Sequence, residues 1–347
     1  MAEQTSPLPV RNGVNATRLR VPTTGPWATV HEYVQQRFGH LDPAGITRRF
    51  TAGEVVDGAG RPLSPEDPLG SCSVIWYYRT LPDEPQLPVQ EEILYEDEHL
   101  VVADKPHFLP TTPAGRYVQQ TLLVRLRNRL NNPDLVPIHR LDRGTAGLVL
   151  LAKNPQTRGK YQLLFENRQV EKSYECISRL SPAASDLDPD AAAHARFPLV
   201  VRNRLEKTKG IVITQSVPYD VEDSGRRPHE RRRAARGKRR TQAVPGANSS
   251  SRVELLETGK NHHGQLTGLF RLTPHTGKTH QLRVHMALLG LGIMHDRFYP
   301  VLESDGPDDF GEPLQLLAKS LSFIDPLTGE ERQFTSARKL VEAPNPH

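Results

Sequence analysis

One polar turn combines a histidine, two arginines and an aspartate directly before a run of apolar residues. It spans His139–Lys153, with the sequence HRLDRGTAGLVLLAK. The apolar run predicts a buried strand over Leu148–Leu151, which would fix the backbone and present Arg140 and Asp142 at the edge of a cleft. A carboxylate held there can act as a nucleophile or as a base. An Asp in a turn is also commonly a cap or a surface ion pair, so the turn alone leaves both roles open.

Two further blocks carry residues suited to the same chemistry. Glu171–Ile177 (EKSYECI) predicts a strand that presents Tyr174, whose ring and hydroxyl either contact a base or pack within the sheet. Phe270–His285 (FRLTPHTGKTHQLRVH) predicts a turn followed by a helix that carries Arg283. Arg283 either pairs with Asp142 or is a solvated helix residue. The turn before it could hold a phosphate at the start of the helix.

Together these blocks resemble RluA-type RNA pseudouridine synthases. The first turn is similar to the signature HRLDxxTxGLxLxAK, and the block with Arg283 is similar to L-x-P-x-T-G-R-T-H-Q-L-R-V-H. Two later stretches also resemble the family: Gly290–Tyr299 (GLGIMHDRFY) and Leu314–Pro326 (LQLLAKSLSFIDP). The resemblance covers residues 93–329. It implies an α+β pseudouridine synthase fold, with a large mixed, mainly antiparallel sheet flanked by helices.

The resemblance also implies a reaction and roles for particular residues. The chain would isomerise specific uridines in structured ribosomal or transfer RNA to pseudouridine through an Asp carboxylate, after flipping the nucleotide out of its helix. It would need no metal and no organic cofactor. Arg140 would fill the stack that the flipped base vacates, because its guanidinium is planar and charged. The implied catalytic residues are Asp142, Tyr174 and Arg283, and the implied RNA- or base-binding residues are His139, Arg140, Thr145, Lys278 and His280.

The sequence departs from the family pattern at several positions. Ala146 stands where Ser is common, Lys278 where Arg is common, His295 where Gly is usual, and Leu317 where His is usual. The block Lys105–Leu122 (KPHFLPTTPAGRYVQQTL) also differs from the commoner Lys-Pro-x-Gly-x-x-x-His-Pro form. These departures leave the proposed catalytic residues in place but weaken any inference about the target RNA.

The elements expected around these residues divide the chain into an arm, a small module, a linker and a large domain. Residues 1–27 predict a flexible arm. Residues 28–80 predict two helices and a hairpin, similar to a small S-four-type RNA-binding module. The alternative is a small α/β appendage without RNA contact. Residues 81–92 are rich in Pro and acidic residues and predict a linker, and residues 93–347 predict the catalytic domain.

Within the catalytic domain, alternation and apolar runs predict further strands and helices. Asn154-Pro155 should begin a helix, because Asn is a favoured N-cap and Pro is tolerated in the first turn. A second helix is expected at Thr279–Leu289, ended by Gly290. The other expected strands are Ile93–Tyr95, Leu100–Ala103, Leu266–Leu272 and Leu314–Phe323.

A basic, almost non-apolar segment at about 219–251 predicts a disordered insert in this domain. Arg226–Arg240 alone carries nine Lys or Arg and one Glu, whereas the whole chain has a formal net charge of +5. The rest of the protein is therefore slightly acidic, and overall charge says little about RNA binding. The insert would add salt-dependent affinity without choosing a uridine, or it would be a solvated loop.

Composition excludes several other classes of protein. Two cysteines over a hundred residues apart fit neither a disulfide framework nor a CxxC metal site. The apolar runs are too short for a membrane span, and no signal peptide is recognised, so a cytoplasmic protein is expected. We also expect a monomer. The histidines lack the spacing of a metal site, which disfavours a metal-dependent nuclease. A catalytically silent RNA-binding or RNA-folding protein is the remaining alternative; it would not need Asp142, Tyr174 or Arg283.

Overall fold

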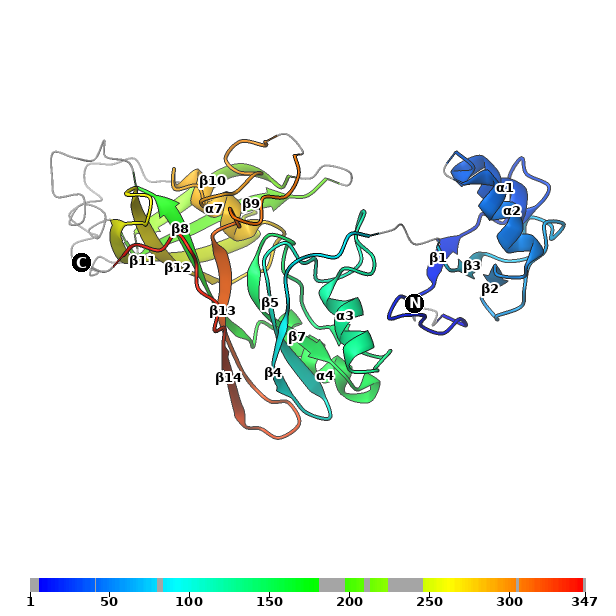
Figure 1. The fold of residues 1–347 in the computed structure, drawn as a ribbon, viewed down its shortest axis with the longest axis horizontal. Helices are drawn as coiled ribbons and strands as arrows, with labels where there is room; N and C mark the ends of the chain where they lie inside the picture. The colour runs from blue at the N-terminus through cyan, green and yellow to red at the C-terminus, as the bar shows by residue number, and fades with distance from the viewer. Residues whose placement is uncertain are drawn as a thin grey trace. The chain divides into compact units, whose positions relative to one another are not determined.

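A computed structural model describes residues 6–40, 42–79, 84–180, 197–208, 213–223, 246–303 and 306–345. The chain forms two compact units (Figure 1). Unit 1 contains residues 1–86 and 113–133, and unit 2 contains residues 87–112 and 134–347. None of the helices in the described ranges has the length and hydropathy that a transmembrane span requires.

Unit 1 packs helices and a three-stranded antiparallel sheet around a small core. Its sheet has the order β1-β3-β2. Thr29 and Asp42 cap the first two helices, and Val30, Tyr33 and Phe50 are buried in the core. The elements are β1 (Thr17–Arg20), α1 (Val30–Phe38), α2 (Pro43–Thr51), β2 (Val56–Asp57), β3 (Val74–Tyr77) and α3 (Leu122–Arg129).

The N-terminal segment of unit 1 corrects one sequence prediction. Residues 1–27 were expected to be a flexible arm, but Thr17–Arg20 pairs with β3, and Val21 is buried in the core. A four-residue strand is too short to give a periodic signal, and its partner lies more than fifty residues away. The segment before β1 also contacts α3, because Arg127 donates hydrogen bonds to the carbonyl oxygen of Gly13 and to the side chain of Asn15. Residues 113–133 therefore belong with unit 1, although the sequence placed them in the catalytic domain.

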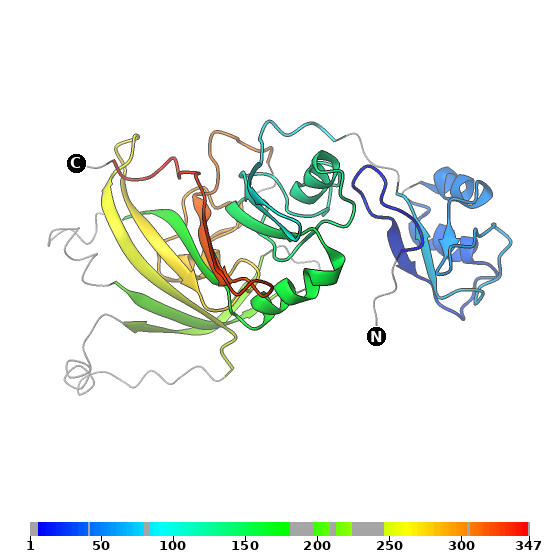
Figure 2. The same cartoon turned by 90° about the horizontal axis from the view of Figure 1, so that it is seen from below.

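Unit 2 is built on one eleven-stranded sheet, as the resemblance predicted. Nine strands form the path β10-β9-β11-β12-β8-β13-β7-β5-β4, while β14 pairs with β13 and β6 pairs with β7. All pairings are antiparallel except β13 with β7, so the sheet is mixed. Figure 2 shows the strong curvature of the long strands coloured green to yellow. The strands are β4 (Glu92–Glu96), β5 (Leu100–Lys105), β6 (Val136–Pro137), β7 (Ala146–Ala152), β8 (Glu171–Arg179), β9 (Leu199–Glu206), β10 (Gln215–Asp223), β11 (Ser249–Lys260), β12 (Leu266–Pro274), β13 (Leu316–Ile324) and β14 (Glu331–Thr335).

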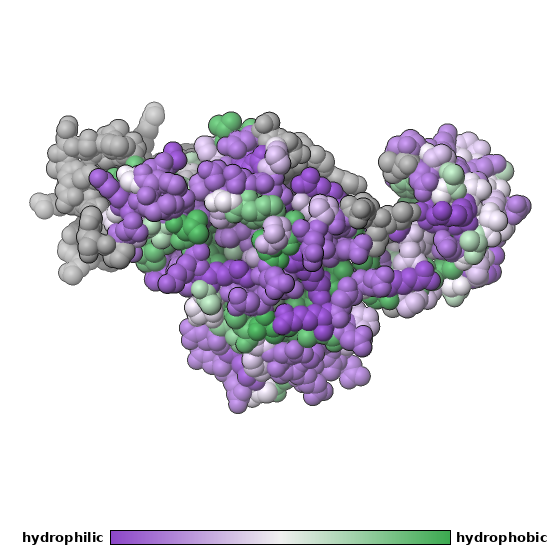
Figure 3. All heavy atoms as spheres, viewed as in Figure 1, coloured by the Kyte–Doolittle hydropathy of each residue, from purple (hydrophilic) through white to green (hydrophobic). Residues whose placement is uncertain are grey.

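Two helices pack on different parts of this sheet. In α4 (Pro155–Glu166), Asn154 caps the first turn as predicted, and Tyr161 and Leu164 pack against strands β5 and β7. In α7 (Gln281–Leu288), Leu282 and Met286 pack with residues of β8, β9, β11, β12 and β13. Figure 3 shows mostly hydrophilic residues on the visible face of unit 2, as expected when apolar side chains are enclosed between helix and sheet.

Both ends of the segment predicted to be a disordered basic insert form strands. Residues 219–223 belong to β10, and residues 249–251 belong to β11, which pairs with β9 and β12. Low apolar content hid these strand ends, because they are stabilised by pairing with distant strands rather than by a local pattern. The remainder of the expected insert, including Arg226–Arg240, lies outside the described residues.

Candidate active site

The turn before β7 holds Asp142 at the N-terminal end of this strand, which lies between β13 and β5 in the sheet of unit 2. The amide of Thr145 donates a hydrogen bond to the carbonyl oxygen of Asp142 at 3.1 Å, which closes the turn. β7 then runs beside β13, and Gly147 has a φ of +110°. A Cβ atom at Gly147 would lie 2.2 Å from the carbonyl oxygen of Ala318, so only glycine permits this close approach of the two strands. The Asp142 carboxylate remains accessible, with 32% of its side chain exposed.

Arg283 links this turn to α7. Its Nη1 lies 3.6 Å from Oδ2 of Asp142, as the resemblance implied. Its Nε and Nη2 donate hydrogen bonds of 2.8 and 2.5 Å to the two carboxylate oxygens of Asp296. Burial alone would lower the pKa of Arg283, but the hydrogen-bonded Asp296 and the charge of Asp142 raise it above its ordinary value. The guanidinium therefore carries a fixed positive charge beside Asp142.

Asp296 is a site residue that the sequence reasoning did not select. Its side chain has no exposed area, and its Oδ1 also accepts hydrogen bonds from the amides of Phe298 and Tyr299. The rings of Phe298 and Tyr299 lie 4.7 and 5.4 Å from the Arg283 guanidinium carbon. The stretch GLGIMHDRFY was recognised as part of the family pattern, and its Asp and Tyr were the available signal. Asp296 holds Arg283 in the orientation that reaches Asp142.

His280 approaches Asp142 from the start of the same helix. Its Nε2 lies 3.7 Å from Oδ2 of Asp142, and its Nδ1 lies 2.9 Å from the hydroxyl of Tyr299. Its φ of 57° places it in the left-handed region, so the helix begins at Gln281 and not at Thr279 as predicted. Burial lowers the pKa of His280, the charge of Asp142 opposes this effect, and Arg283 adds to it. The net lowering of the pKa favours the neutral imidazole, which can hydrogen-bond without adding charge.

Tyr174 lies on β8, which pairs with both β12 and β13. Its side chain is partly buried and packs on the core beneath α7. Burial raises the pKa of the Tyr174 hydroxyl above its ordinary value, and the negative charge of Asp142 raises it further. The hydroxyl therefore stays protonated at neutral pH, where it can donate a hydrogen bond but is a poor base.

Lys105 is a second residue that the sequence reasoning missed. It ends β5 and is completely buried, and its ammonium group donates to the carbonyl oxygens of Pro106, Leu109 and Arg143 at 2.8–3.3 Å. Burial lowers its pKa to about 7, and the charge of Asp142 opposes that shift. Lys105 thus ties the segment after β5 to the Asp142 turn. Lys105 begins the block KPHFLP, which differs from the commoner family form, but the sequence gives no sign that this lysine is buried.

The other predicted RNA-binding residues lie outside the cluster of Asp142, Arg283 and His280. His139 accepts a hydrogen bond from the amide of Leu150 and stacks on Phe165 at 4.6 Å, so it supports the strand rather than facing the site. Burial lowers its pKa to about 3. Thr145 is buried in the turn, while Arg140 and Lys278 are exposed.

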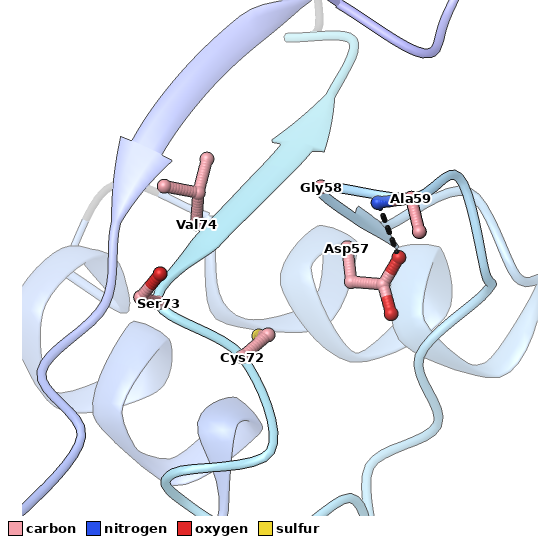
Figure 4. A pocket seen from close by; sticks show the side chains of 6 residues that line it. All are labelled: Asp57, Gly58, Ala59, Cys72, Ser73 and Val74. Atoms are coloured by element: carbon pink, nitrogen blue, oxygen red, sulfur yellow. Dashed lines mark hydrogen bonds between the residues drawn. The ribbon is translucent and has the colours of Figure 1, made fainter. Parts of the chain in front are cut away.

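Two other groups of side chains within the described residues have the makings of a site. A shallow pocket in unit 1 is lined by residues 57–59 and 72–74 (Figure 4). Its one carboxylate, Asp57, already accepts hydrogen bonds from Ala59 and Arg61. In unit 2, the ligand atoms of His262, His263 and Glu342 lie within 4.8 Å of one another. The spacing of residues along the chain does not indicate this group, because Glu342 is about eighty residues from the two histidines. The absence of a catalytic metal remains a prediction.

Comparisons with known proteins place the chain among enzymes that modify RNA. Residues 99–288 match the family model for RNA pseudouridylate synthases. The dual-specificity RNA pseudouridine synthase RluA of Vibrio parahaemolyticus is 30% identical over 235 residues, which cover 68% of this chain and 78% of that protein. The tRNA pseudouridine(31) synthase of Saccharomyces cerevisiae is 29% identical over 209 residues, covering 60% of this chain and 46% of that protein.

A solved structure of human RNA pseudouridylate synthase domain containing 1 is similar at 22% identity, with a TM-score of 0.49. That likeness covers 74% of this chain and 86% of the human chain. The matched family region contains the Asp142 turn, Tyr174 on β8 and Arg283 on α7. The chain belongs to the RNA pseudouridylate synthase family as an RluA-type member, an isomerase that converts uridine in RNA to pseudouridine.

Proposed function

We propose that this protein modifies specific uridines in structured ribosomal or transfer RNA, as a cytoplasmic monomer, with Asp142 as the catalytic carboxylate. The observation that carries the proposal is the meeting of three elements within unit 2. The β7 turn supplies an accessible carboxylate, and α7 supplies a guanidinium 3.6 Å from it. Strand β8 supplies Tyr174, which pairs with Ala318 of β13, the residue that also pairs with Gly147 of β7. One anion with a fixed counter-charge and an aromatic ring suits attack on a nucleoside.

Each residue then has a distinct task. Asp142 attacks C1′ of the ribose or the base, or removes a sugar proton, while uracil leaves through N1 and reattaches through C5. Arg283 orients the carboxylate because Asp296 fixes the other edge of the guanidinium. Tyr174 offers its ring to the uracil and its protonated hydroxyl as a donor.

The target nucleotide must leave its helix before Asp142 can reach the glycosidic bond. Extruding a base costs about a few kcal/mol, and contacts to the empty stack can offset that cost. Arg140 is two residues from Asp142 in the same turn and is exposed. We assign the vacated stack to Arg140, whose planar guanidinium can stack and hydrogen-bond with neighbouring bases.

Unit 1 is assigned to RNA binding on simpler grounds. On β1 the side chains of Arg18 and Arg20 are exposed, while those between them are partly buried. Arginines on an exposed strand face can contact phosphates, which increases affinity without selecting a sequence.

Mapping of pseudouridine in cellular RNA, with and without this protein, tests the proposal. Sites lost in the deletion strain should return with the wild-type gene and not with Asp142→Asn. The matched control is Glu331→Gln, which changes an exposed carboxylate on β14 of the same unit. Restoration of the lost sites by Asp142→Asn would overturn the role of the carboxylate, and no lost site in ribosomal or transfer RNA would overturn the substrate class.

A further inference from the structure

Phe108 has a backbone conformation that a bulky residue seldom adopts. It lies just after β5 with a φ of +64°, in the left-handed region that favours glycine. Side chains held in such a conformation cluster at functional sites, because the surrounding structure must enforce them. The family form recognised in the sequence carries glycine at this place in the Lys-Pro-x-Gly block, whereas this chain carries a phenylalanine.

Several contacts hold the Phe108 segment against the Asp142 turn. Nζ of Lys105 donates to the carbonyl oxygen of Arg143, and Nδ1 of His107 lies 2.7 Å from the carbonyl oxygen of Gly144. At the other end of the segment, the Thr111 hydroxyl donates to the carbonyl oxygen of Leu141 and accepts from its amide. Residues 105–111 therefore run along residues 141–144, and Phe108 lies beside the catalytic turn.

Phe108 is part of an aromatic pair. Its ring centroid lies 4.9 Å from that of Phe310, at an interplanar angle of 60°. The guanidinium carbon of Arg143 lies 5.8 Å from the Phe108 ring centroid, and this guanidinium pairs with both carboxylate oxygens of Asp308. Phe310 is 42% exposed, so its ring is accessible from solvent.

We propose that Phe108 and Phe310 form a stacking platform for an unpaired base that flanks the target uridine. The inference rests on the proposed function, because it places the occupant beside the base that Asp142 attacks. Aromatic faces beside the site of an RNA-modifying enzyme suit the face of an unstacked base. Asp308 neutralises Arg143, so the surface offers rings rather than a free positive charge, which favours a base over a phosphate. The platform stacks the base next to the target and so favours uridines whose neighbour is unpaired.

The test uses binding, so that it does not depend on turnover. Stem–loop RNAs with randomised loops and 5-iodocytidine are bound to the Asp142→Asn protein, irradiated and mapped by mass spectrometry. Cytidine cannot be the isomerised base, so a crosslink reports a neighbouring position. Crosslinks are expected at Phe108 or Phe310. Crosslinks confined to other residues would overturn the platform.

Variants in the same Asp142→Asn background measure the contribution of the rings. Base–aromatic stacking predicts that Phe310→Leu weakens binding of the crosslinked RNA about five- to one-hundred-fold. Phe310→Tyr keeps an aromatic ring and should bind the RNA as tightly as the parent protein. Leu163→Ala, which changes an exposed apolar residue on α4, should also leave binding unchanged. An abasic nucleotide at the crosslinked position should weaken RNA binding by the parent protein. It should weaken binding by Phe310→Leu little further, because the ring that would stack on the base is already absent. Equal binding by Phe310→Leu, Phe108→Leu and the parent would refute the proposal.

A catalytic assay with the Asp142 side chain present separates this inference from the proposed function. If pseudouridine never forms while the crosslink and the Phe310→Leu defect persist, the proposed function fails and the platform stands. If pseudouridine forms at the mapped sites with Phe310→Leu at the wild-type KM, the platform fails and the proposed function stands.

Discussion

Two carboxylates contact the same guanidinium, and they differ in almost every other respect. Asp296 is fully buried and accepts two hydrogen bonds from Arg283 and two from backbone amides. Asp142 is one-third exposed, and its contacts with Arg283 and His280 are 3.6 and 3.7 Å long, beyond ordinary hydrogen bonds. A buried carboxylate with saturated hydrogen bonds is inert, whereas an exposed carboxylate with a nearby cation is available for reaction. The number of donors around each side chain, and not the residue type, separates the two roles.

The largest expected effect comes from exchanging each carboxylate for its amide. Asp142→Asn should lower turnover by at least about 1000-fold with little loss of stability, because it removes a reacting charge at nearly constant volume. Asp296→Asn should cost about 3 kcal/mol of unfolding free energy, because it leaves Arg283 buried without its partner. Urea unfolding and single-turnover assays of both variants check this contrast. Equal loss of stability in the two variants would contradict the division of roles.

Arg283→Lys asks whether the two carboxylates need one planar group. An ammonium keeps the charge but cannot donate to both oxygens of Asp296 while facing Asp142. We expect turnover to fall about ten- to one-hundred-fold, with a stability loss of about 1–2 kcal/mol. Arg252→Lys, at a partly exposed ion pair on β11, is the control. Wild-type turnover by Arg283→Lys would detach Arg283 from the action of Asp142.

Tyr174→Phe tests a hydroxyl whose pKa is raised by burial and raised further by the charge of Asp142. The ring area is kept, so RNA affinity should change less than about twofold. If the hydroxyl takes part in C5 deprotonation, the single-turnover rate should fall about tenfold or more. Quenched-flow measurement at saturating RNA separates these quantities. An unchanged rate would assign Tyr174 to packing or stacking alone.

Acid should weaken the fold through histidines outside the carboxylate pair. Burial lowers the pKa of His139 to about 3, and of His107 and His285 to about 4. Unfolded histidines bind protons below about pH 6.5, so the stability present above that pH is lost as pH falls toward the folded values. By pH 5 each histidine should cost about 2 kcal/mol. Urea unfolding at pH 7 and pH 5 should show a smaller loss for His139→Gln; an identical loss would exclude His139 as a contributor.

Chelation should have the smallest effect on turnover. The partner of Asp142 is a guanidinium, whose positive charge repels a cation that would bind the same carboxylate. EDTA should leave the rate unchanged once RNA folding is controlled with a monovalent salt. A loss that one specific metal restores would contradict this expectation. The His262→Ala/His263→Ala double variant would then test the group formed by His262, His263 and Glu342.

The sequence predicted those parts of the site that depend on local pattern. The apolar run after Asp142 gave β7, the Asn-Pro pair gave the start of α4, and the motif placed Arg283 near Asp142. It did not identify Asp296 as the second partner of Arg283, because that pair depends on how a loop folds back on α7. The burial of Lys105, the strands β1, β9 and β10, and the left-handed Phe108 were missed for a related reason: each depends on distant neighbours.

The parallel pairing of β13 with β7 has a consequence for when the enzyme becomes competent. β13 lies between β7, which follows the Asp142 turn, and β8, which carries Tyr174. Leu317 pairs with Ala146, a contact between residues far apart in sequence, and such contacts form late in folding. A ribosome that has translated only as far as α7 has already made Asp142, Tyr174 and Arg283. Until β13 emerges, the strands of Asp142 and Tyr174 lack the strand that joins them. An unfinished or truncated chain therefore carries the proposed catalytic residues without bringing them together.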